Sequence, residues 1–375
     1  MHVITGLSTG GAETMLFKLL SATTRDWDPA VVSLMSEGSI GRRISKLGIP
    51  VYSLGLRRAM PNPLRVLSII RLTRRLRPQL IQGWMPHGNL MASLAGVSSQ
   101  VRVPVLWNIR MCVNDMAAEP LLTAATIRLG AFLSRHAAAI IYNSEIGARQ
   151  HEKLGYHAAR RVVIPNGFDC QMFGPDNEAR RQVRAELGIG SDTILIGLIA
   201  RFHPMKDHAG FLRAAGLVAR AHRKVSFLFA GNGVTSAEPM LMERIAEQGL
   251  QGHTLLLDER PDIPRLTAAL DIACSASAWG EGFSNSIGEA MACGVPCVVT
   301  DVGDSANIVG STGLSVPLRD PDAMAQAIGQ LIEAGPEHRR HLGAAARRRI
   351  ENEFSLPMIA RRYEDLYRSH LADTH

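Results

Sequence analysis

Residues 272–300, IACSASAWGEGFSNSIGEAMACGVPCVVT, contain a complete strand–helix–strand pattern. Ile272–Cys274 and Cys297–Thr300 are short apolar runs, which predict buried strands. Ser284–Cys293 lies between them and repeats its apolar side chains at helical spacing, which predicts a helix that packs on the strands. The turn Gly294-Val295-Pro296 ends that helix. Two strands joined by a crossover helix form part of a parallel sheet.

The same alternation of short β-rich runs and longer helical patterns extends over the chain and restarts near its middle. The predicted strands are His2–Gly6, Ala30–Leu34, Val51–Leu54, Leu80–Gly83, Val103–Asn108, Ala139–Asn143, Thr193–Ala200, Val225–Ala230, Thr254–Leu257, Ile272–Cys274 and Cys297–Thr300. The predicted helices are Glu13–Ser21, Leu64–Leu76, Leu121–Ser134, His208–Ala221, Met240–Gln248, Asp262–Ala269, Ser284–Cys293, Ala323–Glu333 and Ser355–Leu371. This order predicts two doubly wound α/β units in tandem.

The length of 375 residues suits two domains better than one core. We expect the seam at the turn-forming cluster Pro165–Asp169, with the polar stretch Gly174–Arg184 beyond it. Open α/β sheets bind ligands at the carboxyl ends of their strands. The loops that follow strands are therefore where we look for functional residues, and two such domains facing each other would form a cleft.

The composition is that of a soluble globular protein, with 46% hydrophobic and 20% charged residues. No apolar run reaches the length of a membrane span. The first residues run directly into a strand-and-turn pattern, so we expect no signal peptide. The five cysteines are odd in number and form no CxxC pair, which favours a reduced, cytoplasmic setting.

The net charge of +7 is carried mostly by arginine. A basic protein can bind nucleic acid, an anionic membrane or phosphorylated small molecules. Aromatic residues are only 5% and do not interleave with the basic ones, which argues against a nucleic-acid platform. Solvated helix faces are the commoner explanation of such clusters. The clusters are Arg57-Arg58, Arg71–Arg77, Arg339-Arg340 and Arg347–Arg349.

The first strand is followed by a glycine-containing loop, Ser8–Glu13, that opens a helix. Gly10 and Gly11 would let backbone N–H groups approach an anion at the helix N-terminus. The loop is not G-x-G-x-x-G and no P-loop lysine follows, so neither a dinucleotide site nor a P-loop site is predicted. An ordinary tight turn explains the glycines equally well.

The equivalent loop of the second unit carries Arg201 and Lys206 and ends at a helix start. A planar guanidinium and a point-charge ammonium at a strand's carboxyl end suit a diphosphate. Both could instead be solvated surface cations. Gly231 follows the next strand, in a turn that would let a nucleotide lie close to the backbone.

Two glutamates, Glu281 and Glu289, bracket the start of the helix in the opening stretch. The first N–H groups of that helix, near Gly282–Asn285, are available to a ligand. Helix side chains tilt toward the N-terminus, so Glu289 can lean back toward Glu281. Two carboxylates around a cluster of donors suit a sugar or a ribose. An exposed helix glutamate and a first-turn acid favoured by the helix dipole are the alternative.

Together these motifs resemble those of the retaining glycosyltransferase family 4, which has the GT-B fold. The run from Glu281 to Glu289 resembles the family's E-x7-E signature. Other motifs match in the family's order over nearly the whole chain: the glycine loop Leu7–Glu13, the hinge motif Ile164–Asp169, the phosphate-binding pair Arg201 and Lys206, and the post-helix turn Gly294-Val295-Pro296.

The resemblance implies two Rossmann-like, doubly wound domains that face a central cleft. Residues 1–167 would bind the acceptor and would be joined by the C-terminal helix, 355–371, crossing back to this domain. Residues 168–354 would bind a nucleotide-sugar donor. Closure of the cleft would then be coupled to binding.

The resemblance also implies roles for individual residues. Glu281 would contact donor-sugar hydroxyls, Glu289 the ribose, and Arg201 with Lys206 the diphosphate. Gly10 and Gly11 would lie against the donor phosphate or the acceptor. The remaining donor-binding residues would be Asn166, Gly231, Gly282, Phe283, Ser284 and Asn285.

One departure from the family concerns the reaction centre. Many members carry a histidine after the strand that corresponds to Val103–Leu106, whereas this chain has Trp107-Asn108-Ile109-Arg110. Arg110 is therefore one candidate for a catalytic role facing the acceptor or the sugar. His87, after another strand, is a second candidate, although a loop histidine is more often solvated or capping.

The implied reaction moves a sugar from a nucleotide diphosphate, with UDP the commoner donor in the family, to an acceptor hydroxyl with retention. Cationic side chains would stabilise the leaving group, so we expect no cofactor and no metal. Asp26-Trp27-Asp28 and Asp320-Pro321-Asp322 resemble DxD triplets but are typical of turns. A nucleotide-sugar epimerase of the same fold and a non-catalytic nucleotide-sugar-binding protein are the alternatives.

The expected partners are a nucleotide sugar and a carbohydrate or lipid-linked acceptor, with no nucleic acid. Bacterial polysaccharide or glycolipid synthesis at the inner face of the membrane would suit them. Leu64–Leu76, with basic residues beside Leu67 and Ile70, could contact such a membrane. A buried crossover helix with a basic outer face is the alternative.

Overall fold

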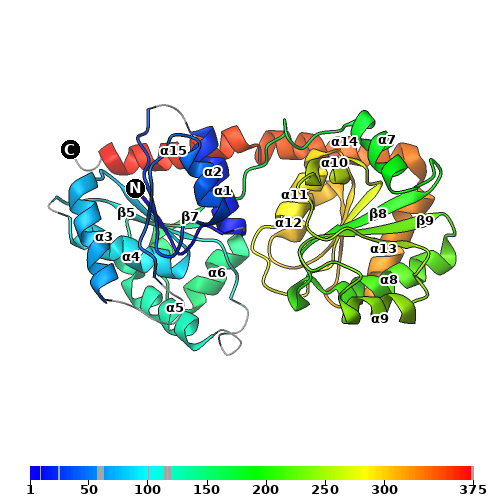
Figure 1. Ribbon diagram of the computed structural model, residues 1–375, viewed down its shortest axis with the longest axis horizontal. Coiled ribbons are helices and arrows are strands. Elements are labelled where there is room, and N and C mark those ends of the chain that lie inside the picture. Colours follow the sequence, from blue (N-terminus) through cyan, green and yellow to red (C-terminus); the bar gives the residue numbers. More distant parts are fainter. Residues whose placement is uncertain are drawn as a thin grey trace. The chain divides into compact units, whose positions relative to one another are not determined.

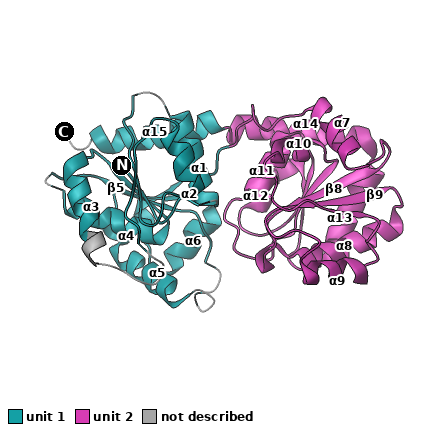
Figure 2. Ribbon diagram, in the orientation of Figure 1, with its two compact units in different colours: residues 1–167, 356–375 teal, residues 168–355 magenta. Residues whose placement is uncertain are grey.

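The computed structural model describes residues 1–372 except 9, 24–25, 57–62, 100, 114–115 and 117–119. Thr9 and the Arg57-Arg58 cluster of the sequence analysis lie outside the described residues. The chain divides into two compact units (Figure 2): Met1–Gly167 with Leu356–His375, and Phe168–Ser355. Each unit is a parallel sheet with helices on both faces (Figure 1).

Unit 1 contains a seven-stranded sheet in the order β3-β2-β1-β4-β5-β6-β7, and each neighbouring pair is parallel. Its strands are β1 His2–Ile4, β2 Val31–Ser33, β3 Val51–Ser53, β4 Ile81–Trp84, β5 Val105–Ile109, β6 Ala139–Tyr142 and β7 Arg161–Val163. Its helices are α1 Gly11–Ala22, α2 Gly38–Ser45, α3 Pro63–Leu76, α4 Met85–Val97, α5 Leu121–Leu133, α6 Glu145–Lys153 and α15 Leu356–Ala372.

Alternating side chains of the unit 1 strands enter two cores, because successive residues of a strand point to opposite faces. Ile4 packs with α1, α2 and α15 on one face. Its neighbour Val3 packs with α3 and α4 on the other, where α5 and α6 cover the adjoining strands. Figure 1 shows α1, α2 and α15 on one side of this sheet and α3, α4 and α5 on the opposite side.

The last helix, α15, belongs to unit 1 although unit 2 precedes it in the chain. Ile359 and Tyr363 are fully buried in the unit 1 core, and Tyr367 nearly so. The ring of Tyr363 stacks on Trp84 with 6.4 Å between centroids. The expected return of the C-terminal helix to the first domain is confirmed.

Unit 2 contains a six-stranded sheet in the order β10-β9-β8-β11-β12-β13, also with parallel neighbours. Its strands are β8 Ile194–Ile199, β9 Val225–Ala230, β10 Thr254–Leu256, β11 Ile272–Ser275, β12 Cys297–Thr300 and β13 Leu314–Val316. Its helices are α7 Asn177–Glu186, α8 His208–Ala221, α9 Pro239–Glu247, α10 Ile263–Ala268, α11 Asn285–Ala292, α12 Ser305–Val309, α13 Pro321–Glu333 and α14 Gly335–Glu353.

The helices of unit 2 also form two layers. One core lies against α7, α10, α11, α12 and α14, and the other against α8, α9 and α13. Figure 1 shows α7, α10 and α14 together on one side and α8, α9 and α13 on the other. Strand β8 lies between β9 and β11, so the strand order reverses there and makes a topological switch point.

The predicted fold class, two doubly wound α/β units, is confirmed by these sheets. The edge strands β7 and β13 were not predicted. The loop predicted around His87 is wrong, because α4 begins at Met85 directly after β4. Within the described residues, no helix has the length and apolarity needed to cross a membrane.

Candidate functional site in unit 2

The loop after β8 turns sharply before α8 begins. Arg201 is exposed on this loop, and Lys206 ends a short 3-10 turn, Pro204–Lys206. Asp207 has a φ of 45° and accepts a hydrogen bond from the N–H of Gly210 at 2.9 Å, so it caps α8. Burial lowers the pKa of His203, and the charges of Arg201 and Lys206 lower it further.

Lys206 and Glu281 form an ion pair at this edge of the sheet. The Lys206 ammonium donates to Oε1 of Glu281, and the Ser277 hydroxyl donates to the same oxygen at 2.8 Å. The side chains of Lys206 and Glu281 are only 17% and 11% exposed. The structure thus brings together two predicted site residues from the loops after β8 and β11.

Glycines let neighbouring loops approach the ion pair. Gly303 has a φ of +57°, and a Cβ there would lie 2.1 Å from the carbonyl oxygen of Glu281. Gly231 has a φ of +147°, and a Cβ there would lie 2.4 Å from the carbonyl oxygen of Ala200. The loops after β8, β9, β11 and β12 therefore pack against each other only because these positions lack side chains.

Helix α11 starts where the sequence predicted it, with Ser284 as its N-cap residue. Gly282, Phe283 and Ser284 are buried, and the Phe283 ring packs 6.1 Å from that of Phe168. Asn285 begins the helix, and Glu289 is half-buried one turn further along. Their implied roles toward a donor stay predictions.

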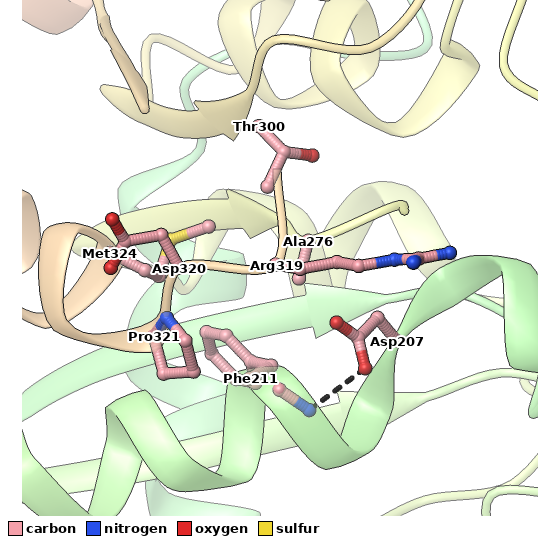
Figure 3. Close-up of a pocket in the computed structure, with 9 residues that line it drawn as sticks. Asp207, Phe211, Ala276, Thr300, Arg319, Asp320, Pro321 and Met324 are labelled. Atoms are coloured by element: carbon pink, nitrogen blue, oxygen red, sulfur yellow. Dashed lines mark hydrogen bonds between the residues drawn. The ribbon is translucent and has the colours of Figure 1, made fainter. Parts of the chain in front are cut away.

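A small cavity of about 10 Å³ lies beside the loops after β8, β11 and β12. In Figure 3, Phe211, Pro321 and Met324 lie together on one side of it, and Asp207 lies on the other with its bond to the Gly210 N–H. A cavity of this size holds about one water molecule. A nucleotide sugar would have to bind outside it, over the loops.

Two residues near this edge escaped the sequence analysis. Ser277 supports Glu281, as described above. Arg319 lines the small cavity with a φ of 55°, and its guanidinium lies 5.8 Å from the ring centre of Trp279. Arg319 follows the unpredicted strand β13, so recognising that strand would have placed it among the post-strand loops.

Predicted site residues in unit 1

The glycine loop of unit 1 begins α1, with Gly10 as N-cap and Gly11 as the first helical residue. A Cβ on Gly10 would lie 2.4 Å from Oε2 of Glu13, so the Glu13 carboxylate folds back over this helix end. Burial raises the pKa of Glu13. A carboxylate of the chain itself therefore occupies the space beside Gly10.

Arg110 lies within a hydrogen-bond network of unit 1. One terminal nitrogen donates to the Tyr363 hydroxyl at 3.1 Å and to the Asn108 side chain at 3.3 Å. The other donates to the Asn166 side chain, which the sequence analysis placed in the hinge motif. Burial lowers the pKa of Arg110. Arg110 thus joins β5, α15 and Asn166, and its predicted catalytic role is not tested by these contacts.

His87 is half-buried in the first turn of α4. Its Nε2 atom lies 3.4 Å from the hydroxyl of Thr126 on α5, and burial lowers its pKa. Its proposed part in the reaction stays a prediction.

Relationship to known proteins

Two family models match the chain. The model described as glycosyl transferase 4-like domain matches residues 10–167, and that described as glycosyl transferases group 1 matches residues 193–334. Together the two matches span well over half of the chain.

Curated relatives give the same family. A D-inositol 3-phosphate glycosyltransferase of Corynebacterium urealyticum is 31% identical over 61% of this chain and 56% of that protein. The lipopolysaccharide core biosynthesis mannosyltransferase LpsB of Rhizobium meliloti is 29% identical over 64% and 67%. The chain spans about half the length of several curated relatives that it matches.

Solved structures share the fold over the full chain. Anabaena Alr3699/HepE, solved in complex with UDP, is 22% identical over 98% of this chain and all of that one, with a TM-score of 0.85. A glycosyltransferase from Rickettsia africae is 18% identical over 99% and 98%, with a TM-score of 0.82. The fold is therefore GT-B, and the chain belongs to the group 1 glycosyl transferases.

Proposed function

We propose that this protein transfers a sugar from a nucleotide-diphosphate donor, a UDP-sugar, to an acceptor hydroxyl with retention of configuration. The observation that carries the proposal is the ion pair of Lys206 with Glu281, at the carboxyl edge of the unit 2 sheet. It joins a cation suited to a phosphate and an acceptor suited to a sugar hydroxyl. The family supports the same assignment.

Lys206 can bind Glu281 and a phosphate at the same time. An ammonium has three N–H donors, and Glu281 accepts one of them. The other donors can reach a phosphate above the loop, where Arg201 adds an exposed guanidinium. In this arrangement Glu281 accepts from donor-sugar hydroxyls, and Glu289 accepts from the ribose.

The main catalytic task is to stabilise negative charge on the leaving phosphate as the glycosidic bond breaks. Arg201 and Lys206 would do this through charge-assisted hydrogen bonds, each worth about 1.5–3 kcal/mol. Metal independence is part of the proposal, because these cations supply the positive charge that a metal would otherwise supply.

The choice of UDP is supported by Anabaena Alr3699/HepE, whose structures contain UDP and UDP-glucose. A relative from Escherichia coli is named as using UDP-Gal and a diphosphoundecaprenol-linked acceptor, whereas one from Corynebacterium glutamicum is named as GDP-mannose-dependent. We therefore propose a lipid-linked or carbohydrate acceptor in polysaccharide or glycolipid synthesis, with contact to the membrane surface at the inner face.

The proposal is tested by a binding panel of UDP-, GDP- and ADP-sugars in EDTA, repeated with Arg201→Ala and Glu289→Ala. We expect a UDP-sugar to bind without metal and each substitution to weaken binding. If no nucleotide sugar bound, or both variants bound like the parent protein, the donor site would be wrong.

Turnover separates this proposal from the alternatives, which the comparisons do not favour. A transferase releases UDP when an acceptor is added, and the anomeric configuration of the product by NMR reports retention. An epimerase would interconvert free UDP-sugars, and a binding protein would release no UDP.

A further inference from the structure

Unit 2 has an open hollow of about 550 Å³ that the proposed reaction does not use. It lies where β11 and β12 begin, since Asp271 and Pro296 in its wall directly precede those strands. The candidate donor site lies at the opposite edge of the same sheet, where the strands end. The other walls are the start of α7, the end of α10 and one face of α14.

The hollow is lined by five arginines. Arg180 comes from α7, and the others come from α14. Arg339-Arg340 and Arg347-Arg348 are separated by two helical turns, so they lie on the same face of the helix. Two arginine clusters that look like separate solvated faces in the sequence thus line one surface.

Three of these arginines are held by backbone carbonyl groups. Carbonyl oxygens satisfy guanidinium N–H groups but carry no full charge, so these bonds by themselves do not neutralise an arginine. The bonds run from Arg180 to Ala269 and Leu270 at 2.9 and 3.0 Å, from Arg339 to Leu331 and Ile332 at 2.8 and 3.1 Å, and from Arg347 to Ala292 and Phe173 at 2.5 and 3.3 Å.

Carboxylates around the hollow are fewer than the cations and mostly occupied. Asp271 is shared by Arg180 at 2.6 Å and by Arg184 at 3.1 Å. Asp176 caps α7 by accepting from the Ala179 N–H at 2.8 Å. Glu351 pairs with Arg347 at 2.8 Å.

The two outer arginines are the least neutralised. Arg340 and Arg348 are exposed, and in the described part of the chain Arg340 makes one ion pair, with Glu337 at 4.0 Å. Arg348 has no ion pair among the described residues. Burial lowers the pKa of Arg339, while the charge of Asp271 raises it and that of Arg180 lowers it.

We propose that this hollow is a second anion site, which binds a phosphate group of a ligand carrying at least two negative charges. Arg340 and Arg348 would donate N–H groups to its oxygens, in the planar geometry that arginine offers to phosphate. Arg339, which has no ion pair among the described residues, adds positive charge beside them, whereas Arg180 and Arg347 are paired with Asp271 and Glu351 and contribute guanidinium groups to the wall. Helices α7 and α14, which carry these arginines, lie outside the residues that match the family models.

The test is calorimetric titration of the full-length protein with inorganic pyrophosphate at low ionic strength, where exposed charges are least screened. Because the candidate donor site also suits a diphosphate, every protein in the comparison carries Arg201→Ala. We expect pyrophosphate to bind to this background. Adding Arg340→Ala and Arg348→Ala should weaken binding at least about tenfold, since charge-assisted hydrogen bonds are lost.

The matched control adds Arg213→Ala and Arg220→Ala, which remove the same charge from exposed positions of α8 on the other face of the sheet. We expect the control to bind like the background. Equal weakening by both pairs would show a general charge effect and overturn the site. A protein with Arg340→Lys and Arg348→Lys keeps both positive charges but loses the guanidinium donors. It shows whether a loss of pyrophosphate binding comes from the donors rather than from the charge.

A second arm distinguishes a free phosphorylated ligand from a lipid headgroup. Vesicles of phosphatidylcholine with and without phosphatidic acid, whose phosphomonoester headgroup can carry two negative charges, are sedimented with the same proteins. Pyrophosphate binding that depends on Arg340 and Arg348 identifies a soluble ligand, and vesicle binding with that dependence identifies a headgroup. If neither probe binds in a way that depends on these arginines, the proposal is wrong.

Discussion

The side chains of Lys206 and Glu281 are mostly shielded from water, so each charge depends on the other for its stabilisation. We predict that Lys206→Ala lowers kcat/KM for the nucleotide sugar by about tenfold to a hundredfold, because it removes one charge-assisted bond worth about 1.5–3 kcal/mol. It also leaves Glu281 with a hydrogen bond from the Ser277 hydroxyl but without its cation. Steady-state kinetics measure the effect.

An exposed ion pair in the same unit provides the control for Lys206. Lys224 pairs with Asp192, and their side chains are 72% and 62% exposed. Surface pairs contribute little. Lys224→Ala should therefore leave kcat/KM unchanged, and an equal loss in both variants would contradict the role given to Lys206.

His208 makes the stability of unit 2 depend on pH. It is buried between the rings of Phe202 and Phe229, and burial is the main cause that lowers its pKa from 6.5 to about 4. Between pH 6.5 and pH 4 the His208 imidazole is protonated in the unfolded chain but neutral in the folded state. Its effect on the free energy of unfolding is therefore absent above pH 6.5, and stability is lost as the pH falls toward 4.

We predict that this histidine makes the folded state about 2 kcal/mol less stable at pH 5 than at pH 8. Urea unfolding at the two pH values measures the loss. His208→Leu should reduce the difference by about that amount, whereas His338→Gln, at an exposed position on α14, should not. An unchanged difference in His208→Leu would exclude His208 as the source.

The sequence could name both members of the Lys206–Glu281 pair, because each follows a predicted strand. It could not show that they touch, since they are 75 residues apart and meet only through the parallel pairing of β8 with β11. Arg110 shows the opposite case. Its bond to Tyr363 depends on where α15 docks, which no local sequence pattern shows.

Helix α14 packs against the turn before β12 so closely that only glycine fits. A Cβ on Gly343 would lie 1.9 Å from the carbonyl oxygen of Gly294. We predict that Gly343→Ala destabilises the protein by about 1–3 kcal/mol, the usual cost of overpacking. Thermal unfolding followed by circular dichroism measures it.

Helix α13 contains the matching control glycine. A Cβ on Gly329 would have no neighbour nearer than 3.7 Å, at His222. Gly329→Ala should stabilise the helix by about 0.4–1 kcal/mol, because alanine loses less backbone entropy. If both substitutions shifted unfolding in the same direction, the close contact at Gly343 would not explain the result.

The helices that were predicted correctly have clear apolar periodicity, as in α8 and α11. Helix α4 was missed because Met85 takes a φ of 66° directly after β4, so no turn signal separates strand from helix. Basic or polar helices such as α14 were also missed, since few positions of α14 are buried and Ile350 is its only large apolar one among them. Tertiary packing, not local preference, holds such helices in place.

Unit 1 is discontinuous, because its core includes α15 from beyond unit 2. We predict that a chain ending at Ser355 cannot maintain unit 1, since Ile359, Tyr363 and Tyr367 fill the core on one face of its sheet. Unit 2 keeps all of its strands and both of its cores. Limited proteolysis should therefore degrade residues 1–167 and leave a fragment of about residues 168–355.

A single substitution separates packing from hydrogen bonding in the same helix. Tyr363→Phe keeps the ring against Trp84 and removes only the hydroxyl that accepts from Asn108 and Arg110. It should leave unit 1 folded and resistant to protease, unlike the truncation. Degradation of unit 2 together with unit 1 in the truncated chain would contradict the independence of the two cores.

The order of elements along the chain also has a consequence for synthesis. All of residues 168–355 leave the ribosome before α15 does, so the unit that begins second can finish folding first. Until then, the nascent first unit exposes the apolar face that Tyr363 will cover. A ribosome that stalls before residue 356 would hold a finished domain next to an unfinished one, and that uncovered face is where a holdase chaperone would bind.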